Sequence, residues 1–132
     1  MTREEFEARL QAIKDSSSHF LRLVKYVELH KRELAKKYGE KPLPETLLKT
    51  LGESYIEDHY PLCKYCKKVV EGTGKLKCSC CPVFKETKLE HCAGTYFFDM
   101  VDTPDWERWM FFAKREITFL RNLYIKEKKR GW

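Results

Sequence analysis

The sequence contains no run of apolar residues long enough to cross a membrane. Its first residues, Met1 to Glu5, include two acids and lack the apolar stretch of a signal peptide. There is also no internal repeat and no low-complexity segment. These absences argue against membrane, secreted and repeat proteins. With 132 residues, of which 42% are hydrophobic, we expect one soluble, cytoplasmic domain spanning residues 1–132, without membrane contact.

Cysteine is absent from residues 1–62 and 93–132, and all six cysteines lie between them. They are Cys63, Cys66, Cys78, Cys80, Cys81 and Cys92. Thiols spaced this closely indicate a metal site, disulfides or redox chemistry, and the reducing cytoplasm favours the metal. Disulfides would regain weight in a hyperthermophile.

By spacing alone, four of these cysteines form a C-x2-C-x11-C-x2-C pattern, which is typical of structural zinc. They are Cys63, Cys66, Cys78 and Cys81. His59 or His91 could replace one thiolate. An all-thiolate shell argues against catalytic zinc, which keeps an open position.

The first long helix is predicted over residues 3–38. Thr2 and Glu5 fit a capping box, and Gly39 and Pro42 supply stop signals. Apolar positions follow at the spacing of one helical face; they are Phe6, Leu10, Ile13, Ser17, Phe20, Val24 and Val27. The serines at 16–18 interrupt this stripe, so we expect a kink or a point of close packing there.

A second long helix is predicted over residues 104–129, with Thr103 as N-cap and Pro104 in its first turn. Its stripe contains Trp106, Met110, Ala113, Ile117, Leu120 and Tyr124. The fold class is therefore mainly α, an antiparallel pair of long helices that bury their stripes against each other. An irregular, zinc-stabilised, cysteine-rich segment, residues 60–95, lies between them and should cap the end where the chain crosses over. Short helices are predicted from Pro44, Pro61 and Pro82.

Seven lysines surround the cysteines and could bind the phosphates of a nucleic acid or a nucleotide. They are Lys64, Lys67, Lys68, Lys75, Lys77, Lys85 and Lys88. The alternative is a solvated surface that balances an anionic zinc–thiolate centre. Among the aromatic residues of the last helix, Phe111 lies off the apolar stripe and is the best candidate for an exposed contact.

Three stretches and a closing segment resemble a family of small phage and prophage proteins that typically read Cys-Pro-Leu-Cys, Cys-x-x-Cys-Pro-Val and Cys-x-Gly-Thr-Pro-Tyr. The matching stretches are Tyr60-Pro61-Leu62-Cys63, Cys78-Ser79-Cys80-Cys81-Pro82-Val83, Cys92-Ala93-Gly94-Thr95-Tyr96 and Phe119-Leu120-Arg121-Asn122-Leu123. Tyr60 stands where the family has its first cysteine, Cys66 and Cys80 are additional, and the proline after Thr95 is missing. The resemblance implies zinc ligation by Cys63, Cys78, Cys81 and Cys92, with Cys66 as the substitute.

The resemblance carries no established biochemical activity. It suggests a non-enzymatic, zinc-stabilised accessory protein that binds a host protein or another host macromolecule, with antagonism of a host defence as one role. For a viral protein, the cytoplasm would be that of the host cell. The alternatives are an anion-binding module for nucleic acid or a nucleotide signal, and a thiol redox protein using Cys63 and Cys66. The long apolar seam also permits a homodimer.

Overall fold

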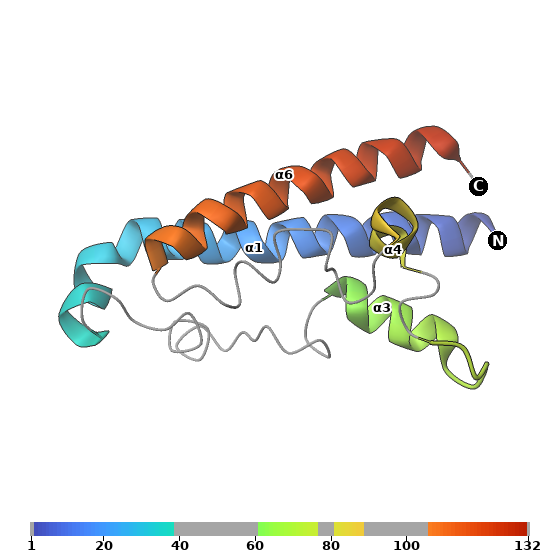
Figure 1. Ribbon diagram of the computed structural model, residues 1–132, viewed down its shortest axis with the longest axis horizontal. Helices are drawn as coiled ribbons and strands as arrows, with labels where there is room; N and C mark the ends of the chain where they lie inside the picture. The colour runs from blue at the N-terminus through green and yellow to red at the C-terminus, as the bar shows by residue number, and fades with distance from the viewer. Residues whose placement is uncertain (1, 39–60, 77–80, 89–105, 132) are drawn as a thin grey trace.

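The structure, a computed structural model, describes residues 2–38, 61–76, 81–88 and 106–131. Four helices make up most of these residues (Figure 1). They are α1 (Arg3–Tyr38), α3 (Pro61–Val70), α4 (Pro82–Thr87) and α6 (Trp106–Arg130). The predicted mainly helical fold is confirmed. The expected start of the last helix at Pro104, and the helix expected from Pro44, lie outside these residues. None of the described helices is long and apolar enough to span a membrane.

Helix α1 starts with the predicted capping box. The Thr2 hydroxyl accepts a hydrogen bond from the Glu5 N–H at 3.1 Å, and the Glu5 carboxylate accepts one from the Thr2 N–H at 3.0 Å. The backbone leaves helical geometry at His30, where φ is −111° and ψ is 17°. Figure 1 shows the last turns of α1 bending away from its main axis. The kink therefore lies at His30 and not at the serines of residues 16–18.

The core lies along the seam between α1 and α6, which run antiparallel (Figure 1). Every position of the predicted α1 stripe is buried, and Ile13 and Phe20 have no exposed surface. From α6, the seam receives Trp109, Ala113, Ile117, Leu120 and Leu123. Of the stripe predicted for this helix, Ala113, Ile117 and Leu120 are buried, Met110 and Tyr124 are half-buried, and the side chain of Trp106 lies outside the described residues. The long helices thus bury their apolar faces against each other, with the face of α6 shifted toward Trp109 and Leu123.

Ion pairs at the rim of the seam agree with the antiparallel direction. Glu28 pairs with Lys114 at 2.8 Å, and Lys31, three residues later, pairs with the earlier residue Glu107 at 3.4 Å. Exposed pairs of this kind contribute little stability. They mark the register of the two helices and do not create it.

Ser16 is the point at which α3 docks on α1. The Ser16 side chain is fully buried, donates a hydrogen bond to the Ala12 carbonyl and accepts one from the Leu62 N–H, both at 3.0 Å. The Leu62 N–H belongs to the first turn of α3, where backbone donors have no partner within the helix. Ser16 thus acts as an N-cap supplied by another helix, and the serine cluster is a point of close packing.

The expected place of the cysteine segment was wrong for the described helices α3 and α4. They lie toward the end of the pair where α1 begins and α6 ends, not at the crossover end (Figure 1). The polar partners of α3 lie in the first half of α1: the Leu62 N–H donates to Ser16 Oγ, and the Tyr65 hydroxyl donates to the Glu5 carbonyl at 3.4 Å. The connection of residues 39–60 is long enough to allow this, since an extended chain covers about 3.3 Å per residue.

Replacing Ser16 by alanine tests this docking point. The S16A variant leaves the buried Leu62 N–H without its acceptor, so we expect the free energy of unfolding to fall by about 1–2 kcal/mol. Urea unfolding followed by circular dichroism measures the change. The control is S18A, at an exposed position of the same serine run, which should change stability by less than about 0.5 kcal/mol. Equal effects of the two substitutions would contradict the docking role of Ser16.

Candidate functional site

The three cysteines that the structure describes all point toward the core. Cys66 of α3 is 1% exposed and packs in the same apolar cluster as Leu62, while Cys63 is half-buried against that cluster. Cys81 directly precedes α4 and is 8% exposed. No disulfide joins these three residues to one another. The thiols therefore line the inner side of α3 and the start of α4.

The described residues alone do not make a complete metal site. Among residues 2–38, 61–76, 81–88 and 106–131, no three His, Cys, Asp or Glu side chains come together in a way that could hold one ion. Cys63, Cys66 and Cys81 therefore do not converge on a single point. The other predicted ligands, Cys78 and Cys92, lie outside the described residues, as do Cys80, His59 and His91.

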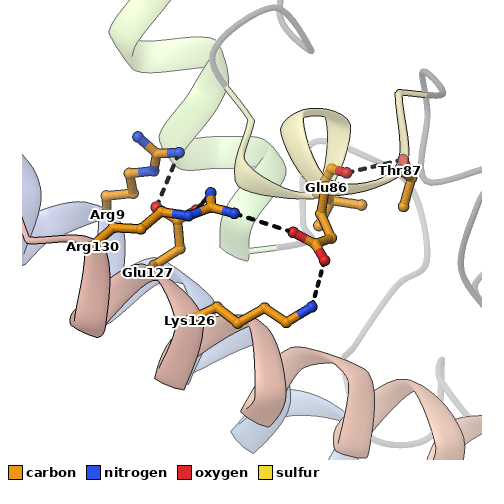
Figure 2. Close-up of polar contacts among 7 residues, drawn as sticks. Arg9, Glu86, Thr87, Lys126, Glu127 and Arg130 are labelled. Atoms are coloured by element: carbon orange, nitrogen blue, oxygen red, sulfur yellow. Dashed lines mark hydrogen bonds and ion pairs between the residues drawn. The ribbon is translucent and has the colours of Figure 1, made fainter.

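An ion-pair network fixes α4, and with it Cys81, to the end of α6. Figure 2 shows the Glu86 carboxylate between two cations of α6: Lys126 Nζ donates to Oε1, and Arg130 Nη2 lies 3.5 Å from Oε2. The hydrogen bond from Lys126 lowers the pKa of Glu86; partial burial opposes this, and the positive charges of Lys126 and Arg130 add to the lowering. Val83 of α4 is buried in the core, so both charge and apolar contact hold this short helix.

The same network continues into the seam between the long helices. Arg130 Nη1 donates to Glu127 Oε1 at 3.0 Å, and Arg9 Nη2 of α1 lies 3.2 Å from Glu127 Oε2 (Figure 2). The side chains of Arg9 and Glu127 are only 7% and 5% exposed. Loss of either partner would leave an uncompensated buried charge and strongly destabilise the protein. The contact therefore ties the start of α1 to the end of α6.

Sequence analysis missed this network, although a signal was present. Glu127 follows Leu120 by seven residues and Leu123 by four, so it occupies a position on the buried face of α6. Arg9 follows Phe6 by three residues and precedes Ile13 by four, so it lies on the apolar face of α1. Arg9 and Glu127 thus carry opposite charges on the apolar faces of two helices that pack together. This pattern predicts that the two side chains form a buried ion pair.

Three of the predicted lysines form a basic face on α3. Lys64, Lys67 and Lys68 are exposed and lie at the three- and four-residue spacing of one helical face, opposite Cys66. Together with Val70 and Glu71 they line an open hollow of about 480 Å³. We call Lys64, Lys67 and Lys68 the α3 basic face.

Of the remaining predicted lysines, the structure describes the side chains of Lys75 and Lys88, and neither lines this hollow. Lys75 is exposed in the segment after α3, and Lys88 is exposed after α4 with a φ of 65°. Lys77 and the side chain of Lys85 lie outside the described residues. Among the aromatic residues, Trp109 is buried, whereas Phe111 is 51% exposed, as its place off the stripe predicted.

The lowered pKa of Glu86 predicts a pH-dependent contribution to stability. Because the folded-state pKa lies below the ordinary value of 4.5, this contribution is complete above about pH 4.5 and disappears as the pH falls through the folded-state pKa. We expect E86Q to be less stable than the wild type at pH 7, with the difference shrinking toward pH 3. Unfolding in urea at a series of pH values measures it.

The matched control for this experiment is E71Q, which removes an exposed carboxylate from the turn after α3. Its stability difference from the wild type should stay small across the same pH range. A difference between E86Q and the wild type that is constant with pH would contradict the role of the Glu86 charge.

Comparison with known proteins adds no relative to this picture. A scan against protein-family models, a search of curated proteins and a search of solved structures each found no match. The function must therefore be inferred from the residues of this chain and their arrangement.

Proposed function

We propose that this protein is a non-enzymatic accessory protein that binds the phosphate backbone of a host nucleic acid through the α3 basic face. The observation that carries the proposal is the division of α3 into two faces. Its lysines face solvent around one hollow, whereas Cys66 and Leu62 face the core. One short helix thus combines a structural side and a binding side.

The shape of the α3 basic face favours an extended polyanion over a small nucleotide. The three lysines project from the convex surface of a helix around an open hollow, whereas small-molecule sites enclose most of their ligand. Point charges on flexible stems suit a phosphate backbone, whose binding depends mainly on charge neutralisation. The lysines are the warrant for a nucleic acid as partner; the phage-type resemblance adds only that the partner would belong to a host, with antagonism of a host defence as one consequence.

On the inner side, the proposal includes one structural zinc ion held by Cys63, Cys78, Cys81 and Cys92. This set is the one that the family resemblance implies, whereas the spacing of the cysteines alone would use Cys66 in place of Cys92. When bound, zinc would contribute folding free energy. The chain would supply four thiolates, two of them from positions already fixed by the docking of α3 and α4.

Burial of the thiols argues against the redox alternative. Thiol–disulfide exchange requires an accessible thiolate, and its rate depends on access. Cys66 is 1% exposed and packed among apolar side chains, so an oxidant has little access to it. The Cys63–Cys66 pair is therefore better suited to a structural role than to catalysis.

Charge substitutions on the α3 basic face test nucleic-acid binding. In the triple variant K64Q/K67Q/K68Q, we expect weaker binding to a fluorescein-labelled 20-base-pair DNA duplex. The slope of log affinity against log salt should fall by about 2–3, since each lost phosphate contact removes about 0.9. Fluorescence anisotropy at salt concentrations from about 50 to about 200 mM measures the affinity and its salt slope.

A control with the same loss of charge separates this face from the net charge of the protein. The K14Q/K25Q/K36Q variant removes three exposed lysines from α1 and should bind the duplex nearly as the wild type does. Equal losses in the two triple variants, or salt-insensitive binding by the wild type, would overturn the proposed function.

Zinc content tests the ligand set. We expect C92S to lose most of its zinc and to unfold at a lower temperature, because a missing thiolate weakens a site whose binding energy stabilises the fold. We expect C66S to keep about one zinc ion per chain. Elemental analysis of the purified proteins measures both. Full zinc retention by C92S would show that the ligand set is wrong.

A further inference from the structure

The outward face of α6 exposes an aromatic ring. Phe111 is 51% exposed and precedes the fully buried Leu120 by nine residues, which places the two side chains on opposite sides of the helix. A large apolar side chain at the centre of a solvent face loses the stabilisation that burial would give it. Phe111 and its neighbours are therefore a candidate binding surface.

Neighbouring side chains hold the Phe111 ring and form a hollow beside it. The Arg115 guanidinium carbon lies 4.4 Å from the centre of the ring, and Phe112 meets the ring edge-on at 5.3 Å. The hollow has a volume of about 520 Å³ and is lined by Phe111, Lys114, Arg115, Thr118, Phe119 and Asn122. Two aromatic rings, two cations, a hydroxyl and an amide thus surround one open space.

The charge of this face selects an anionic ligand. The exposed cations of α6 are Arg108, Lys114, Arg115, Arg121, Lys126, Lys128, Lys129 and Arg130. Of the acids of α6, Glu116 and Glu127 are buried, and Glu107, which is exposed, pairs with Lys31 of α1. Acids of other helices also reach these cations: Lys114 pairs with Glu28 of α1, and Lys126 and Arg130 pair with Glu86 of α4. The exposed cations still outnumber these acids, so the outward surface of α6 carries a net positive charge, which attracts polyanions.

The composition of the hollow distinguishes between anionic partners. An acidic amphipathic peptide would need a hydrophobic groove for its row of apolar anchors, but four of the six lining side chains, Lys114, Arg115, Thr118 and Asn122, are polar or charged. A nucleobase requires an aromatic surface for stacking, polar groups for its edge and cations for the adjacent phosphates. Phe111, Asn122 and Arg115 supply one of each.

From this arrangement we infer that the outward face of α6 binds single-stranded nucleic acid, with one base stacked on Phe111 in the hollow. Bases within a duplex are stacked on each other and present only their edges, so this ring can accept a base only from an unpaired strand. The inference deepens the proposed function and rests on it for the class of ligand, but it uses a different surface from the α3 basic face.

The F111A variant tests the inference with a fluorescein-labelled dT20 oligonucleotide and the 20-base-pair duplex as probes. We expect F111A to bind dT20 about 5- to 150-fold more weakly than the wild type, the range for loss of one stacked base. Its salt slope should stay unchanged, because no charge is removed. Duplex binding should change by less than about twofold. F111W, which keeps an aromatic surface, should retain the wild-type affinity for dT20.

The matched control is I125A, which removes an apolar side chain of equal exposure, 50%, from the same helix but outside the hollow. It should bind both probes as the wild type does, and thermal unfolding should show that all three variants remain folded. An unchanged dT20 affinity in F111A, or equal losses in F111A and I125A, would overturn the inference.

The two surfaces can fail separately. If K64Q/K67Q/K68Q weakens duplex binding while F111A leaves dT20 binding unchanged, the proposed function stands and the inference is wrong. If F111A weakens dT20 binding while the α3 triple variant changes nothing, the inference stands and the α3 basic face is not the binding surface.

Discussion

The buried carboxylate of Glu127 is the contact on which the cysteine-bearing end of the structure depends. Its two oxygens meet Arg9 of α1 and Arg130 of α6, and Arg130 also reaches Glu86 of α4. Helix α4 has only 6 residues, far fewer than the roughly 12–15 that an isolated helix needs to be stable in water. Its position, and therefore that of Cys81, comes from this network and from the burial of Val83.

Helix α3 poses the same physical problem and solves it with a different contact. At 10 residues it is also too short to be stable alone. The Ser16 hydroxyl satisfies one of its first-turn donors, and Leu62 and Cys66 enter the core. Helix α3, and α4 with the preceding Cys81, are thus held by contacts with α1 and α6 in which no metal takes part. A zinc ion would join elements that these contacts already bring into place.

Local patterns in the sequence predicted the helices and the pairing of the long ones, because periodic apolar positions specify both a helix and its buried face. They did not predict where α3 and α4 dock. That choice depends on single polar contacts between residues far apart in the chain, such as Leu62 with Ser16 and Arg130 with Glu86. The serine run was visible in the sequence, but a kink and a packing point were equally compatible with it.

Composition alone also understated how basic the outer surface is. The net charge of +6 counts every charge equally, yet among the described residues two acids, Glu116 and Glu127, are buried against one buried cation, Arg9. Acids inside the fold do little to offset the lysines and arginines that face solvent. The lysines were predicted as a group, but only the phase of α3 separates Lys64, Lys67 and Lys68 from the rest.

This distribution gives a reason for keeping an ion pair in the core. An apolar pair of similar size would hold α1 against α6 at least as well, since burying two charges has a desolvation cost that their attraction roughly offsets. Such a pair would not attract Arg130, however, and Arg130 connects Glu127 to Glu86. Glu127 thus holds Arg130 beside α4, in addition to the direct pair between Lys126 and Glu86. Its burial also removes a carboxylate from the solvent face of α6.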